Sequence, residues 1–212
     1  MHAARGRFIT VEGIEGVGKS TNMAFIASAL ESNKIPYVMT REPGGTALAE
    51  EIRSLVLSER QESVTAITEL LLMFAARAQH IEHFIKPHLE AGDWVLCDRF
   101  TDSSFAYQGG GREMDIGLLR QLEKSVQGNL SPDLVILLDL SVDRAMDRIR
   151  ARSDNDRIDA ESISFFNRVR EAFLERARNN PDRYLVLDAS PGIELVQESL
   201  RKGLESFINE NL

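Results

Sequence analysis

The sequence predicts a doubly wound α/β fold, with a five-stranded parallel sheet and helices on both faces. Two observations support this prediction. Five short apolar runs alternate with longer amphipathic segments, which is the βαβ rhythm of a parallel sheet. The first three runs are each followed by a polar motif, at the strand ends where such sheets bind ligands. We expect residues 1–212 to form a single domain, because a chain of this size buries an ample core.

The predicted strands and helices alternate along the chain. The apolar runs are nearly continuous, as expected for strands covered on both faces, and lie at residues 7–12, 35–40, 93–98, 133–140 and 183–188. Apolar residues at helical spacing predict helices over residues 20–33, 47–57, 65–91, 115–127, 142–150, 161–179 and 194–211. The polar segment at 150–160 lies between two helical patterns and is expected to form a short lid.

Composition and charge exclude several classes of protein. The formal net charge of −8 argues against binding to nucleic acid, whose phosphates are held by excess Lys and Arg. No run of ~18 apolar residues is present, which argues against a membrane partner. Cys97 is the single cysteine, so no internal disulfide can form. The apolar run at 8–11 is too short for a signal peptide, and we expect a cytoplasmic protein.

The first polar motif is a phosphate-binding loop. Gly13 and the sequence Gly18-Lys19-Ser20 have the P-loop spacing, between a predicted strand and a predicted helix. In such a loop the backbone N–H groups wrap a phosphate, the lysine reaches the terminal phosphates and the serine binds Mg²⁺. The motif predicts a P-loop NTPase-type fold that binds a nucleoside triphosphate with Mg²⁺. The residues expected to form this site are Gly13, Ile14, Glu15, Gly16, Val17, Gly18, Lys19, Ser20 and Thr21.

Motifs elsewhere indicate what happens to the triphosphate. The guanine-reading element of GTPases is missing, because the segment NKIP at 33–36 lacks its aspartate, and no strand ends in the Asp-Glu pair of motor ATPases. Arginines instead recur outside the loop, at Arg41, Arg53, Arg77 and Arg99. They suit a second, anionic substrate held opposite the triphosphate, which predicts a kinase acting on a monophosphate. A deoxynucleoside kinase and a non-catalytic module that binds nucleoside triphosphates are the alternatives.

Four sequence elements together resemble the thymidylate kinase family. They are the phosphate loop, TREPGGTALAEEIR at 40–53, LLLMFAARAQH at 70–80 with CDRFTDSSFAYQGGGR at 97–112, and RARSDNDRID at 150–159. The resemblance covers nearly the whole chain. It implies transfer of a phosphoryl group from ATP to dTMP, giving dTDP for dTTP biosynthesis, with Mg²⁺ as cofactor. It also implies a homodimer formed through packed helices.

The resemblance implies roles in phosphate and metal binding for five residues. Arg99 is expected to grip the dTMP phosphate, although an ion pair with a neighbouring aspartate is the structural alternative. Arg53 is expected to be a second phosphate clamp, and Glu42 is expected to line the acceptor site. Asp98 resembles the acid that organises Mg²⁺ together with Ser20.

The resemblance also implies which residues bind the base. Arg77, in an otherwise apolar helical stretch, resembles the arginine that hydrogen-bonds the base edge. The family usually places a phenylalanine four residues earlier, where this chain has Met73, and Phe74 comes one residue later. Either Met73 or Phe74 could form the stacking wall, and core packing is the alternative for both.

A short helix after Arg99 is expected to complete the nucleoside site. Ser103, Ser104 and Gln108 resemble polar contacts to thymine, and the i, i+4 spacing puts Ser104 and Gln108 on one helix face. Tyr107 is expected to lie against C2′ of the sugar and to exclude a ribose hydroxyl.

The residue that follows Glu15 changes the expected source of catalytic charge. Some relatives carry a catalytic arginine at this position, where this chain has Gly16. The resemblance implies that the lid supplies the charge as an arginine finger, with Arg152 as first candidate and Arg157 as second. Glu15 is expected to point toward the acceptor sugar or its hydrated Mg²⁺, and a loop-shaping bond to nearby backbone is the alternative. The expected catalytic residues are Lys19, Arg99, Arg152, Arg157 and Glu15.

Overall fold

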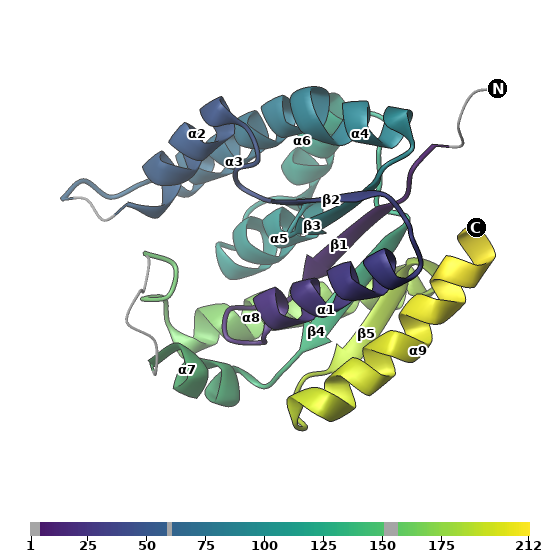
Figure 1. The fold of residues 1–212 in the computed structure, drawn as a ribbon. Helices are drawn as coiled ribbons and strands as arrows, with labels where there is room; N and C mark the ends of the chain where they lie inside the picture. The colour runs from purple at the N-terminus through teal and green to yellow at the C-terminus, as the bar shows by residue number, and fades with distance from the viewer. Residues whose placement is uncertain (1–4, 59–60, 151–156) are drawn as a thin grey trace.

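The computed structural model describes residues 5–58, 61–150 and 157–212. At its centre is a five-stranded sheet in the order β2-β3-β1-β4-β5, in which every neighbouring pair of strands is parallel (Figure 1). The strands are β1 (Phe8–Glu12), β2 (Tyr37–Arg41), β3 (Trp94–Asp98), β4 (Leu134–Asp139) and β5 (Tyr184–Asp188). They coincide with the apolar runs to within two residues, and the predicted fold class is confirmed.

The helices follow the predicted amphipathic segments. The α-helices are α1 (Lys19–Ser32), α2 (Ala47–Leu57), α3 (Ala66–His80), α4 (Lys86–Ala91), α5 (Thr101–Ser104), α6 (Ile116–Gln127), α7 (Val142–Arg150), α8 (Ile163–Asn179) and α9 (Ile193–Asn211). Two π-helical segments, η1 (Ile81–Ile85) and η2 (Phe105–Gly111), and a 3₁₀ turn, η3 (Pro181–Arg183), complete the described elements. The expected helix over 65–91 is therefore three consecutive segments, because the wider turn of η1 separates α3 from α4.

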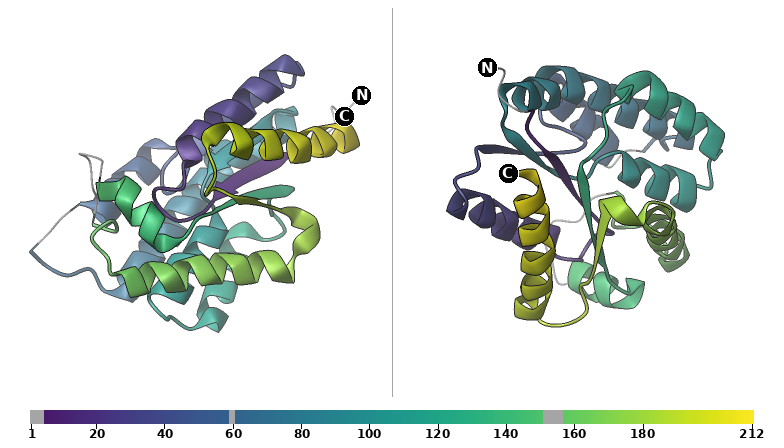
Figure 2. Two further views of the ribbon diagram at one scale, coloured as in Figure 1. Left: turned by 90° about the horizontal axis from the view of Figure 1, so that it is seen from below. Right: turned by 90° about the vertical axis from the view of Figure 1, so that its right-hand side faces the viewer.

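Helices cover both faces of the sheet. α1 and α9 pack on one face, and α4, η1, η2 and α8 lie on the other (Figure 2). Ile9, Ile136 and Phe166 are fully buried in the main core between these layers. Within the described ranges, no helix is long and apolar enough to cross a membrane.

The strand order brings the carboxyl ends of β1 and β3 together. Val11 pairs with Asp98 in the ladder between these strands, so the loops that follow them begin side by side. From β1 the sheet extends through β3 and β2 in one direction and through β4 and β5 in the other. Such a switch point is where open α/β sheets bind ligands.

Candidate active site

The loop between β1 and α1 has the backbone of a phosphate cradle. Gly13, Gly16 and Gly18 have positive φ angles of 135°, 76° and 93°, which glycine adopts without a steric penalty. Gly16 also lies against α7, because a Cβ at this position would meet the carbonyl oxygen of Ala145 at 2.5 Å. Any larger residue at position 16 would therefore displace α7, so the packing itself requires glycine there.

Lys19 lies across the loop. Its Nζ donates hydrogen bonds to the carbonyl oxygens of Gly13, at 3.2 Å, and Ile14, at 3.0 Å. Burial, aided by the positive charge of Arg99, lowers the pKa of Lys19 to about 8. A phosphate bound in the loop would favour the charged ammonium, so the site gains electrostatic stabilisation when an anion binds.

Two oxygen-bearing side chains beside the loop fit a magnesium ion. Ser20 and Asp98 line one pocket of about 440 Å³, here called the loop pocket. Oδ1 of Asp98 is buried and has no hydrogen-bond partner, although buried carboxylate oxygens normally have one. Carboxylate and hydroxyl oxygens are ligands that Mg²⁺ prefers. Ser20 and Asp98 therefore supply the kind of oxygen ligands that a bound Mg²⁺ would need from the protein.

A second pocket of about 90 Å³, the acceptor pocket, adjoins the loop. Glu15 and Phe100 contribute to its wall. Nine of the ten residues predicted to bind the acceptor also line it, namely Glu42, Arg53, Met73, Arg77, Arg99, Ser103, Ser104, Tyr107 and Gln108. Arg53 reaches it from α2 and donates a hydrogen bond from Nη1 to the carbonyl oxygen of Pro43 at 3.0 Å.

Phe74 is the predicted acceptor residue that lies elsewhere. It is 2% exposed and packs with Leu70, Phe105 and Leu119 in a core cluster. One residue on a helix corresponds to a rotation of about 100°, which turns Phe74 away from the pocket that Met73 faces. We therefore withdraw Phe74 as a candidate ligand contact and keep Met73.

Arg99 joins the phosphate loop to the acceptor pocket. Its Nη1 donates to the carbonyl oxygen of Gly13 at 2.9 Å and to Oγ of Ser103 at 3.1 Å. Its Nη2 donates to Glu15 at 2.8 Å and to the hydroxyl of Tyr107 at 3.2 Å. The φ angle of Arg99 is 68°, a left-handed conformation that is rare outside glycine and concentrates at functional sites.

Glu15 turns away from the phosphate cradle and toward the acceptor pocket. One carboxylate oxygen accepts from Arg99, and the other accepts from the hydroxyl of Tyr107 at 2.5 Å. This agrees with the orientation expected from the sequence. The guanidinium of Arg99 offsets the negative charge, so the loop can carry an acid without repelling an anion from its cradle.

A buried hydrogen-bonded chain holds Glu42 and Arg77. Glu42 accepts from Nε of Arg77 at 2.7 Å and lies 3.0 Å from Nδ1 of His80, whose Nε2 lies 2.7 Å from Oγ1 of Thr40. Arg77 also donates to Oγ of Ser104 at 3.0 Å. The guanidinium is therefore fixed at the pocket wall, and His80 orients its carboxylate partner.

Gln108 and Glu12 add two buried polar groups. Nε2 of Gln108 donates to Glu69 at 3.0 Å, while its Oε1 is buried without a partner in the wall of the acceptor pocket. Glu12 is fully buried at the end of β1 and accepts from the backbone N–H of Phe100 and from Oγ of Ser103, both at 2.7 Å. The apolar pattern of the strand does not indicate this buried role for Glu12, because the residues that bond to it lie almost 90 positions away in the sequence.

Burial, with a contribution from the charge of Asp102, raises the pKa of Glu12 to about 8. The folded protein therefore disfavours the ionised carboxyl, and the stability present below pH 4.5 is lost as the pH rises toward 8. Glu12→Gln cannot ionise. We expect its melting temperature relative to wild type to increase between pH 6 and pH 9 by about 2–4 °C or more.

The control for this prediction is Glu205→Gln, which removes an exposed carboxyl. Calorimetric melting of the three proteins at each pH measures the effect. A constant difference between Glu12→Gln and wild type over this range would show that Glu12 does not titrate there.

The lid arginines are only partly described. Arg152 lies outside the described residues. Arg157 donates from Nε to the carbonyl oxygen of Val56 at 3.2 Å and from Nη2 to Glu69 at 2.5 Å, away from the phosphate loop. Arg148, which the sequence analysis did not single out, donates from α7 to the carbonyl oxygens of Gly16, at 3.1 Å, and Ala189, at 3.3 Å.

Comparisons with known proteins agree with this geometry. The family model for thymidylate kinase matches residues 11–200. A thymidylate kinase of Teredinibacter turnerae is 51% identical over 203 residues, which cover 96% of this chain and 99% of the relative. One of Marinomonas sp. is 52% identical over 200 residues, covering 94% of each protein. The solved structure of thymidylate kinase from Ehrlichia chaffeensis superposes with a TM-score of 0.76 at 34% identity, covering 95% of this chain and 99% of that one.

The fold, the phosphate loop and the adjoining arginine-lined pocket define a P-loop kinase that acts on nucleoside monophosphates. The full-length similarities are more specific. The chain belongs to the thymidylate kinase family.

Proposed function

We propose that this protein transfers the γ-phosphoryl group of ATP to dTMP, giving ADP and dTDP for dTTP biosynthesis. The single observation that carries the proposal is Arg99, which bonds to the phosphate loop and also lines the acceptor pocket. An acceptor phosphate held by this guanidinium would lie directly beside the phosphates in the loop. Such adjacency is what direct phosphoryl transfer requires.

In the proposed reaction, a phosphate oxygen of dTMP attacks the γ-phosphorus while the bond from that phosphorus to the bridging oxygen of ADP breaks. Lys19 and the N–H groups of the loop hold the donor phosphates, and Arg99 and Arg53 hold the acceptor phosphate. Mg²⁺, held by Ser20 and Asp98, would neutralise charge that develops on the phosphates. The lid arginines are proposed to add positive charge at the transferring group, with Arg152 preferred, since Arg157 is paired with Glu69.

Recognition of the base is proposed for the far wall of the pocket. The unpartnered Oε1 of Gln108 is an acceptor that suits an imide N–H, and the guanidinium of Arg77 is a donor that suits a base carbonyl. Met73 provides an apolar surface for the ring. The acceptor is therefore proposed to be a pyrimidine nucleotide that offers both groups, as thymine does.

The proposed function is tested by comparing acceptors at saturating ATP and Mg²⁺. We expect rapid ADP formation with dTMP and almost none with thymidine or without an acceptor. Faster turnover of thymidine would favour the deoxynucleoside kinase, and ADP formation that is independent of any acceptor would contradict the proposal. Arg53 and Arg99 argue against a neutral 5′-hydroxyl acceptor, because two guanidinium groups that line the acceptor pocket suit an anionic substrate.

Tyr107 is proposed to exclude ribonucleotides. Its ring lines the acceptor pocket and packs against Phe165 and Phe173, with centroids 6.2 Å apart in both pairs. We expect Tyr107→Ala to reduce the ratio of kcat/KM for dTMP to that for its ribose analogue by about tenfold, because the steric barrier is removed. Tyr107→Phe keeps the ring and should keep the ratio. Equal ratios in wild type and Tyr107→Ala would refute the steric role.

A homodimer is proposed to form through α2 and α3. These helices pack together and expose apolar side chains at Leu48, Leu55, Ile67 and Leu71. Spacings of seven residues on α2 and four on α3 put each pair on one helix face, so the exposed side chains form a stripe. A second copy of the chain would cover it, as the family resemblance implies. We also propose that the enzyme acts in the cytoplasm, where ATP and deoxynucleotides are available.

Leu71→Glu is expected to convert this dimer to a monomer, because the charge would be buried without a partner at the interface. Leu71 is 50% exposed, and Leu195 on α9, at 58%, provides a matched control. Sedimentation equilibrium should give a dimer for wild type and Leu195→Glu and a monomer for Leu71→Glu. A dimeric Leu71→Glu would place the interface elsewhere.

A further inference from the structure

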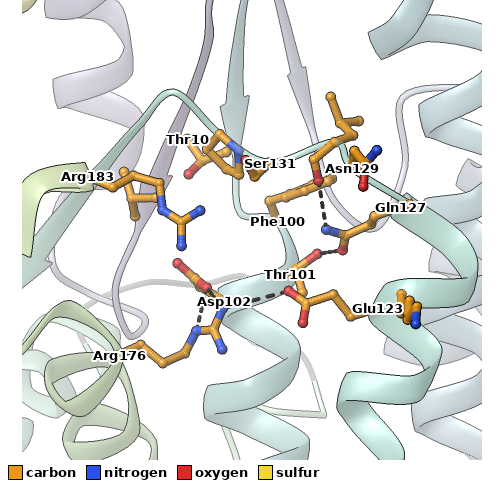
Figure 3. Close-up of a pocket in the computed structure, with 15 residues that line it drawn as sticks. Thr10, Phe100, Thr101, Asp102, Glu123, Gln127, Asn129, Ser131, Arg176 and Arg183 are labelled. Carbon is orange, nitrogen blue, oxygen red and sulfur yellow. Dashed lines mark hydrogen bonds and ion pairs between the residues drawn. The ribbon is translucent and has the colours of Figure 1, made fainter. Parts of the chain in front are cut away.

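A third cavity, here called the rear cavity, shares Phe100 with the acceptor pocket. This rear cavity has a volume of about 220 Å³, compared with about 90 Å³ for the acceptor pocket. Its floor is formed by buried residues of β1, β4 and α5, and the segment from Gln127 to Pro132 and the side chains of Arg176 and Arg183 surround it (Figure 3). Phe100 lines both cavities. The proposed phosphoryl transfer uses none of the polar side chains of the rear cavity.

Several residues that line the three named pockets carry a buried polar atom without a partner, while a further such atom belongs to Asn22, which lines none of them. In the described part of the chain, five buried side-chain atoms lack a hydrogen-bond partner. Two of them, Oδ1 of Asp98 and Oε1 of Gln108, belong to residues that line the loop pocket and the acceptor pocket, respectively. Two others, Oγ1 of Thr10 and Nε of Arg183, belong to residues that line the rear cavity. Since buried polar atoms are normally bonded, the polar wall of the rear cavity is incompletely hydrogen-bonded within the protein.

Both carboxylates of the rear cavity already lie beside Arg176. Asp102 accepts from Nε of Arg176 at 2.5 Å and from the hydroxyl of Tyr184. Glu123 lies 3.9 Å from Nη2 of the same arginine (Figure 3). A cation would have to displace Arg176 from both acids, so the cavity is not built for a metal ion.

The cations, in contrast, exceed the carboxylates. Arg183 points into the cavity (Figure 3). Neither it nor Lys124, an exposed residue that also lines the cavity, forms an ion pair with any described residue. Three cationic side chains, including Arg176, face two carboxylates, which leaves one positive charge in a protein of net charge −8. A positive charge without an ion-pair partner attracts an anion.

The remaining walls indicate what the anion carries. Phe100, Leu130, Pro132 and Val135 give the cavity an apolar side, which suits a short hydrocarbon chain. A guanidinium binds a carboxylate through parallel N–H groups. We propose that the rear cavity binds a small organic monocarboxylate, with its carboxylate on Arg183, near Thr10, and its apolar part against Phe100 and Val135.

Binding can be tested with butyrate, using the backbone amide resonances of Thr101 and Val135 in the full-length protein. Titration at constant ionic strength should give saturable shifts in the millimolar range, and chloride should give none. Arg183→Gln should weaken butyrate binding by at least about tenfold, because a hydrogen bond to a charged group is lost. Arg178→Gln is the matched control, since Arg178 lies on α8 and pairs with Glu171 outside the cavity.

Lys124→Gln supplies a second variant at an exposed position, in case Arg183→Gln fails to fold, and should weaken binding less than Arg183→Gln does. Tighter binding of inorganic phosphate than of butyrate would overturn the carboxylate assignment. Shifts that do not saturate, or that are equal in wild type and Arg183→Gln, would show that the cavity holds only water. The readout does not involve phosphoryl transfer, so it is independent of the proposed reaction.

Discussion

Replacing Arg99 with alanine is expected to lower kcat/KM for dTMP by about 10³-fold or more. Removing one preorganised hydrogen-bond donor from the reacting group typically lowers kcat about 10²–10³-fold. Arg99 is positioned to serve both as a phosphate clamp and as the link to the loop. It donates four hydrogen bonds, two of them to Glu15 and Tyr107. The substitution would therefore also leave Glu15 without a cationic partner beside the incoming phosphate.

Two further variants separate these effects. Arg99→Lys keeps the charge but loses the planar fork, so an intermediate kcat/KM is expected. Arg178→Ala removes an arginine that is exposed and paired with Glu171, and it should leave the kinetics unchanged. Steady-state assays with varied dTMP at saturating ATP measure all three. Near-normal kinetics for Arg99→Ala would overturn the proposed acceptor site.

Lys19→Ala is expected to have a comparably large effect, of at least about 10³-fold on kcat/KM for ATP. Its ammonium lies against the carbonyl oxygens of Gly13 and Ile14, so the loop is organised around it. The loss should appear in kcat as well as in KM, because charge on the donor phosphates increases in the transition state. A change in KM alone would mean that Lys19 only binds ATP.

Lys34→Ala is the control for Lys19→Ala, since Lys34 follows α1 at its far end from the loop. Thermal melting should show that both variants fold. Wild-type kcat in Lys19→Ala would contradict the assigned role of the loop.

Much of the fold could be predicted from the sequence because the spacing of apolar residues along a segment indicates which of its faces is buried. The five strand cores were nearly continuous apolar runs, and their observed bounds differ by at most two residues from the predicted ones. Most of the residues predicted to bind the acceptor line one pocket, because the family motifs fix their positions one by one. The exception, Phe74, shows the limit, because a shift of one residue on a helix moves a side chain from pocket to core.

Other parts of the site depend on partners that are distant in the sequence. Glu12 and His80 are single polar residues, and only the folded chain brings Glu12 to Phe100 and His80 to Glu42. The raised pKa of Glu12 likewise depends on burial, which a strand pattern does not report for a polar residue. Arg148 was hidden among other arginines, and its contact with Gly16 requires α7 to pack against the loop.

Gly16 now has two explanations that act together. The resemblance implies that an arginine is missing at this position, and the geometry shows that α7 lies where any side chain would be. The carbonyl of Gly16 accepts a hydrogen bond from Arg148 on that helix. We therefore expect α7, which ends at Arg150, to connect the loop with the lid predicted at 150–160.

The central claim is that the phosphoryl group passes directly from the loop to an acceptor held by Arg99. The stereochemical course at phosphorus tests this most directly, using ATP with a chiral, isotopically labelled γ-thiophosphoryl group and dTMP as acceptor. Direct in-line transfer predicts inversion of configuration in the product. Retention would show that an enzyme-bound phosphoryl intermediate separates the two nucleotides, and would contradict the account.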